Sequence, residues 1–145
     1  MKVVVSACLL GENCKYNGGN NRCSGVLEFV RGREVISVCP EVLAGLGTPR
    51  LPIEIVDGVV RRRDGSSVDE ALRRATEQIL AELEGQDIEC VILKSRSPTC
   101  GVHQVYDGTF SGKLTDGMGI LAQALAEHGY RVIDSEDFVA KSGIL

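Results

Sequence analysis

The stretch Val91-Ile92-Leu93-Lys94-Ser95-Arg96-Ser97-Pro98-Thr99-Cys100-Gly101 decides how we expect the chain to fold. Its first three residues form a short apolar run, typical of a strand that is covered on both faces of a sheet. Pro98 ends the strand, because proline cannot donate to a strand ladder. Cys100 therefore follows the carboxyl end of a buried strand.

Two other apolar runs end in the same way. Residues 3–7 lead into Cys8, and residues 35–38 lead into Cys39. In an open parallel sheet, ligands bind outside the carboxyl ends of the strands. We therefore expect Cys8, Cys39 and Cys100 to lie together at one edge of the sheet.

The remaining pattern predicts helices between these strands. A capping box at residues 67–70 and apolar residues at helical spacing from Val68 to Leu83 predict a helix that ends at Gly85. Asp57-Gly58, between residues 53–56 and 59–62, predicts a hairpin. Further elements are predicted at 24–31 (helix), 102–112 (hairpin or ordered loop), 115 or 116 to 128 (helix), 131–134 (strand) and 135–137 (helical turn).

Together these elements indicate an α/β fold, a three-layer sandwich with a mainly parallel, Rossmann-like sheet and a small β-hairpin. A length of 145 residues fits a single domain, residues 1–145. The net charge of −4 gives no electrostatic reason to bind duplex nucleic acid. No apolar run approaches the roughly 20 residues that span a bilayer, so we expect a cytoplasmic protein with no membrane partner. A small molecule is the expected ligand.

The chain has six cysteines, at positions 8, 14, 23, 39, 90 and 100. In a reducing compartment this number favours metal, redox or nucleophilic chemistry. Structural zinc sites usually take closely spaced pairs such as C-x-x-C, and the chain has none, so the spacing favours an iron–sulfur cluster with dispersed ligands. Cys8, Cys39 and Cys100 are the candidate ligands, with Cys14 as a candidate fourth.

Other interpretations of the thiols stay open. Cys8 and Cys14 fit a redox couple across their loop. A nucleophilic Cys8 is disfavoured, because the C-x5-R loop of phosphatases needs arginine where Cys14 stands. All six thiols also fit small buried residues, since free cysteine is among the most buried residue types. We expect that role for Cys90, which opens a strand, and regard Cys23 as incidental.

Glu41 and Ser97 are the candidate catalytic residues beside the thiols. Glu41 lies two residues beyond Cys39, where partial desolvation would suit a general acid or base. Ser97 carries a hydroxyl that can orient a substrate. The plain alternatives are a solvated carboxylate and a residue that shapes a turn. Three further polar residues are weighed as ligand contacts against ordinary surface positions: Lys94, Arg50 and His103.

Six motifs in combination resemble the small bacterial and archaeal family that includes 2-thiouracil desulfidase, formerly a domain of unknown function. The resemblance covers nearly the whole chain, with one departure, Thr99, which we expect not to disturb ligation. The motifs are Ser6-Ala7-Cys8-Leu9-Leu10-Gly11, Cys14-Lys15-Tyr16-Asn17-Gly18, Cys39-Pro40-Glu41, Gly47-Thr48-Pro49-Arg50, Ser97-Pro98-Thr99-Cys100-Gly101 and Tyr106-Asp107-Gly108-Thr109-Phe110.

The resemblance implies a [4Fe-4S] cluster on Cys8, Cys39 and Cys100 that acts as a Lewis acid on the sulfur of a thiolated pyrimidine such as 2-thiouracil. Water would replace the sulfur without net redox change, a hydrolytic desulfidase reaction that releases sulfide. By motif match, Glu41 would handle protons and Ser97 would place or activate the substrate. The alternatives are a non-catalytic iron–sulfur protein that senses redox state or carries sulfur, and a zinc-stabilised binding module.

Overall fold

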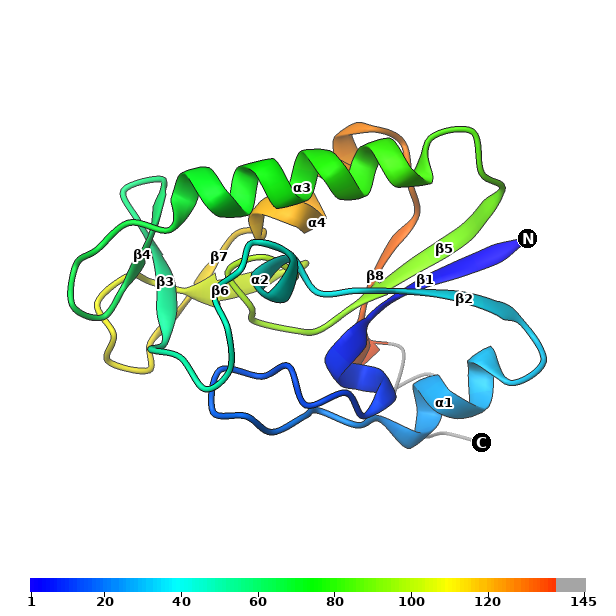
Figure 1. Cartoon of the computed structure of the whole chain (residues 1–145), viewed down its shortest axis with the longest axis horizontal. Helices are drawn as coiled ribbons and strands as arrows, with labels where there is room; N and C mark the ends of the chain where they lie inside the picture. The colour runs from blue at the N-terminus through cyan, green and yellow to red at the C-terminus, as the bar shows by residue number, and fades with distance from the viewer. Residues whose placement is uncertain (138–145) are drawn as a thin grey trace.

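A computed structural model describes residues 1–137 of the chain. Its centre is a four-stranded sheet in the order β2-β1-β5-β8 (Figure 1). Every neighbouring pair of strands in it is parallel. The strands are β1 (Lys2–Ser6), β2 (Glu34–Val38), β5 (Ile88–Leu93) and β8 (Val132–Asp134). The predicted parallel sheet and its four strands are confirmed.

Helices cover both faces of this sheet, so the predicted three-layer sandwich is confirmed (Figure 1). Helices α3 (Asp69–Leu83) and α4 (Ile120–Glu127) lie on one face, where Val4, Val91 and Leu93 are buried against them. Helix α1 (Ser24–Val30) and the 3-10 helix η1 (Ala7–Leu10) cover the other face. Because side chains of a strand alternate between faces, each apolar run contributes side chains to the hydrophobic core on either face of the sheet. This explains why the runs are continuous.

Helix α3 begins at Asp69, but not through the predicted capping box. Ser67 Oγ accepts the backbone N–H of Asp69 at 3.2 Å, and Glu70 pairs with Arg74 at 2.6 Å instead of reaching back to a cap. Asp69 itself accepts the N–H of Val60 at 3.0 Å, which ties the helix to the preceding hairpin. Within residues 1–137 no helix is both long enough and apolar enough to cross a bilayer.

Two antiparallel ribbons extend beyond the sheet. The predicted hairpin is present as β3 (Ile53–Val56) and β4 (Val59–Arg62), joined at Asp57 and Gly58, both with positive φ. A second ribbon pairs β6 (Gln104–Tyr106) with β7 (Leu114–Asp116). The prediction that Thr115 or Asp116 starts a helix is therefore wrong. These residues pair with β6, and α4 (Ile120–Glu127) starts after Gly119.

Candidate active site

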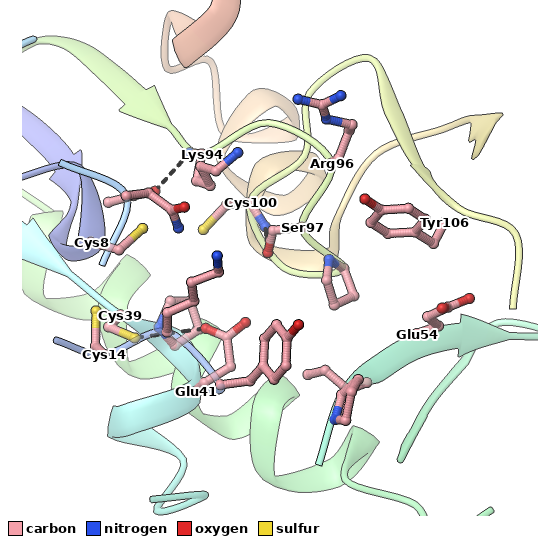
Figure 2. A pocket seen from close by; sticks show the side chains of 18 of the residues that line it. Cys8, Cys14, Cys39, Glu41, Glu54, Lys94, Arg96, Ser97, Cys100 and Tyr106 are labelled. Atoms are coloured by element: carbon pink, nitrogen blue, oxygen red, sulfur yellow. Dashed lines mark hydrogen bonds between the residues drawn. The ribbon is translucent and has the colours of Figure 1, made fainter. Parts of the chain in front are cut away.

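A cavity of about 600 Å³ lies outside the carboxyl ends of β1, β2 and β5. The thiols of Cys8, Cys14, Cys39 and Cys100 all open into it. Figure 2 shows these four sulfur atoms on one side of the cavity and Tyr106 on the other. The predicted convergence of distant cysteines at one sheet edge is therefore confirmed.

Cys8 is held in the first turn after β1. The chain leaves Ser6 and enters η1, which ends at Gly11 with φ of 96°, a conformation that favours glycine. The carbonyl of Cys8 accepts the N–H of Asn21 at 3.0 Å, so the 11–21 loop folds back over it. Burial raises the pKa of the Cys8 thiol, while a hydrogen bond from the Asn21 side chain lowers it in part.

Cys39 is the residue before helix α2 (Pro40–Leu43). Proline is well suited to the first helical position, where its missing N–H has no intrahelical partner anyway. This short helix turns Glu41 inward, where the residue is only 8 % exposed. The Cys39 thiol donates to Glu41 Oε2 at 3.8 Å. The pKa of Cys39 is raised, first by burial and then by the Glu41 carboxylate.

Cys100 sits in a turn that α4 clamps in place. The helix starts against the turn, with the N–H groups of Ile120 and Leu121 donating to the carbonyls of Pro98 at 3.0 Å and Thr99 at 2.9 Å. Gly119 permits this approach, because a Cβ there would lie 2.4 Å from the carbonyl carbon of Thr99. The buried thiol has its pKa raised to about 12 by desolvation and by Glu41.

Cys14 joins the other three thiols from the 11–21 loop. Its thiol is hydrogen-bonded to that of Cys39, and burial raises its pKa. Arg50 fixes the loop by donating to the Cys14 carbonyl at 3.0 Å and to the Gly47 carbonyl at 2.9 Å. Arg50, a candidate anion contact, lines the cavity, and its two terminal nitrogens tie two loops together.

The donor set does not suit a single metal ion. Among residues 1–137, no three Cys, His, Asp or Glu side chains converge tightly enough to hold one. A cuboidal cluster makes a different demand, because each of its irons takes its own ligand, and the ligand sulfurs therefore stand apart. Dispersed thiols around a shared cavity are compatible with that demand.

Thr99 joins the two candidate catalytic residues. Its Oγ1 donates to Glu41 Oε1 at 2.8 Å and lies 3.0 Å from Ser97 Oγ. In the sequence Thr99 stands out only as a departure from a motif, and nothing in its position indicates a contact with a residue 58 positions away. Ser97 also shapes the turn, since its Oγ accepts the N–H groups of Thr99 and Cys100, both at 3.1 Å.

Glu54 is a second residue that the sequence did not single out. It is 8 % exposed, and its Oε1 accepts the N–H of Gly108 at 3.0 Å and of Phe110 at 3.2 Å. These bonds hold the turn after β6 against β3, so that Tyr106 and Phe110 both line the cavity. The Tyr106–Phe110 motif signalled a turn, but not its partner.

Of the remaining candidate residues, one lies at the cavity and the others lie away from it. Lys94 lines the cavity, with its Nζ donating to Ser95 Oγ at 2.9 Å; burial, and then Arg96, lowers its pKa. His103 is exposed and pairs with Asp137. Two thiols lie away from the cavity, on the face of the sheet that α1 covers: Cys90, buried as predicted, and Cys23, half-buried.

Comparisons with known proteins agree with this architecture. A sequence model of the family 2-thiouracil desulfurase matches residues 3–137. A Bacillus subtilis (strain 168) protein described as uncharacterized protein YbbK is 35 % identical, over 93 % of this chain and 96 % of that protein. The solved structure of the [4Fe-4S]-dependent thiouracil desulfidase TudS superposes with a TM-score of 0.87 at 33 % identity and 99 % coverage of each chain. The chain therefore belongs to the 2-thiouracil desulfurase family.

Proposed function

We propose that this protein is a [4Fe-4S]-dependent desulfidase that converts the C=S group of a thiolated pyrimidine, such as 2-thiouracil, to C=O and releases sulfide without net redox change. The observation that carries the proposal is the meeting of thiols from three strand ends with Glu41 and Ser97 in one cavity. The family match and the name of the solved neighbour support the same reaction.

The residues present fit such a cluster. We assign Cys8, Cys39 and Cys100 as its ligands, because they come from three adjacent strand ends and open into one cavity. Thiolates are soft ligands that suit iron, and the positive charge of iron would offset the burial that keeps the free thiols protonated. Three protein ligands leave one coordination position for the substrate. When bound, the cluster would supply a Lewis acid that polarises C=S.

Glu41 is the group we assign to proton handling. Replacing sulfur by water requires that a proton leave the water and that a proton reach the leaving group. Glu41 is buried beside Cys39, one of the assigned cluster ligands, and lines the same cavity. Thr99 occupies only its Oε1, so Oε2 remains the oxygen that can exchange a proton once Cys39 has lost its own.

Ser97 is the group we assign to placing or activating the substrate. Two backbone N–H groups hold its Oγ, so the hydroxyl cannot rotate away from the cavity. Such fixed hydroxyls bring a bound molecule into reacting geometry without further loss of entropy. The half-buried aromatic residues Tyr106 and Phe110 also line the cavity and offer flat surfaces that suit a planar ring.

The test is anaerobic reconstitution with iron and sulfide, followed by incubation with 2-thiouracil and chromatography of the products. We expect uracil and sulfide in equal amounts, from the reconstituted protein and not from the metal-free one. Glu41→Gln should retain its iron and lose turnover. A protein that binds iron but releases no sulfide, with or without Glu41, would instead indicate the non-catalytic iron–sulfur protein.

A further inference from the structure

The Thr99 hydroxyl lies between the two residues to which the proposed reaction assigns chemistry. Thr99 is fully buried, at 0 % exposure, and its Oγ1 is 2.8 Å from Glu41 Oε1 and 3.0 Å from Ser97 Oγ. A buried hydroxyl has a single proton to donate and two lone pairs that accept. Its position therefore limits how the three side chains can share their hydrogen bonds.

Counting donors and acceptors fixes the direction of these bonds. A carboxylate only accepts, so the Thr99 proton goes to Glu41; the Cys100 sulfur, at 3.6 Å, is a weaker acceptor. Ser97 Oγ already accepts two backbone N–H groups, which engages both of its lone pairs. The one bond left to Ser97 is to donate its own proton to Thr99. The three side chains therefore form a hydrogen-bond chain with one direction of donation, from Ser97 through Thr99 to Glu41.

The direction of these hydrogen bonds constrains both Ser97 and Glu41. The Ser97 oxygen is held by two N–H groups while its proton points at Thr99, so this proton is the one group of Ser97 that can turn to a bound substrate. At the other end, Thr99 engages Oε1 of Glu41 and leaves Oε2 facing Cys39. The Thr99 hydroxyl thus sets the direction of the Ser97 proton and decides which oxygen of Glu41 stays unengaged by a hydroxyl.

We propose that Thr99 is a positioning residue, which acts on the reaction through Ser97 and Glu41 by fixing the one-way hydrogen-bond chain between them. The role rests on the proposed desulfidase function, because it assumes that those two residues face the substrate. It follows that a side chain of the size of threonine does not support the full rate of the reaction unless it carries the hydroxyl.

The experiment compares Thr99→Val, which keeps the shape and removes the hydroxyl, with Thr99→Ser, which keeps the hydroxyl. We expect Thr99→Val to lower kcat for 2-thiouracil about 100-fold with little change in KM, as misplacement of reacting groups does, and Thr99→Ser to restore most of the loss. Iron content should match the wild type in both. Thr76→Val is the control, since it removes another buried hydroxyl, on α3, that donates to the Leu72 carbonyl.

Three results would overturn the proposal: a fully active Thr99→Val, an equal loss of kcat in Thr99→Ser, or an equal loss in Thr76→Val. A second measurement does not depend on turnover. In the metal-free protein, the Thr99 hydroxyl proton should give an NMR resonance that shifts in both Ser97→Ala and Glu41→Gln and stays unchanged in Thr76→Val. If the wild type fails to desulfurate 2-thiouracil, the proposed function fails. An unshifted resonance means that the hydrogen bonds from Ser97 through Thr99 to Glu41 are absent.

Discussion

Gly119→Ala tests most sharply whether the start of α4 packs directly against the turn that carries Cys100. Gly119 has an ordinary φ of −68°, so alanine meets no backbone strain of its own there. The added Cβ would lie 2.4 Å and 2.6 Å from the carbonyl carbon and oxygen of Thr99, and 2.7 Å from the N of Cys100. All three are backbone atoms, which cannot rotate away. The start of α4 must therefore move off the Cys100 turn.

The size of the effect follows from what that movement disrupts. Overpacking against fixed atoms costs about 1–3 kcal/mol. The bonds from Ile120 and Leu121 to the turn, at 3.0 and 2.9 Å, would lengthen, and each is worth about 1 kcal/mol. We therefore expect Gly119→Ala to lower the free energy of unfolding by about 4 kcal/mol, a large part of the roughly 5–15 kcal/mol of a typical domain.

Urea denaturation of the metal-free protein, followed by far-UV circular dichroism, measures this loss. Gly85→Ala is the matched control, because nothing lies within 4 Å of its added Cβ. With φ of +79°, it should lose only about 1 kcal/mol, from the left-handed backbone. Equal losses in the two variants would refute the claim that α4 is pressed against the Cys100 turn.

Three further predictions concern the walls and the thiols of the cavity. Glu54→Ala should lose about 2 kcal/mol of stability and expose the amides of Gly108 and Phe110 to hydrogen exchange. Glu54→Gln should retain most of the stability and most of the protection of these amides, since its amide oxygen accepts the same bonds. Equal rates of amide hydrogen exchange in the two variants would contradict this. Arg50→Ala should speed alkylation of Cys14 in the metal-free protein, and an unchanged rate would mean that the loop holds without it. Because the pKa values of Cys39 and Cys100 are raised above the ordinary 9.0, the folded metal-free protein holds its thiol protons more tightly than the unfolded chain. Its free energy of unfolding should therefore fall as pH rises above that value, which urea titrations at pH 8 and 10 would detect; a constant value would contradict it.

The sheet and the meeting of thiols at its edge were predictable because they depend on local and repeated signals. Each strand is a short apolar run, and each candidate ligand follows one at a short interval. Parallel strands then bring Cys8, Cys39 and Cys100 to one edge without any need to know the loops. The hairpin at Asp57-Gly58 was equally local, since its turn requires positive φ.

What could not be predicted depends on contacts between distant segments. The sequence predicts a helix start at Thr115 or Asp116 because both are good caps, but in the structure this segment pairs with β6 instead. Gly119 is needed for a close approach to Thr99, and no pattern in the sequence reveals that partner. Likewise Glu54 and Thr99 gain their roles from residues more than 50 positions away.

Iron and acid-labile sulfide, measured in anaerobically reconstituted protein and in single cysteine-to-serine variants, test the central claim most directly. The wild type should hold four irons and four sulfides per chain, the composition of the [4Fe-4S] group named for the solved neighbour. The serine variants of Cys8, Cys39 and Cys100 should lose them, while Cys23→Ser and Cys90→Ser should keep them. A wild-type protein without iron, or equal iron in all five variants, would contradict the assignment.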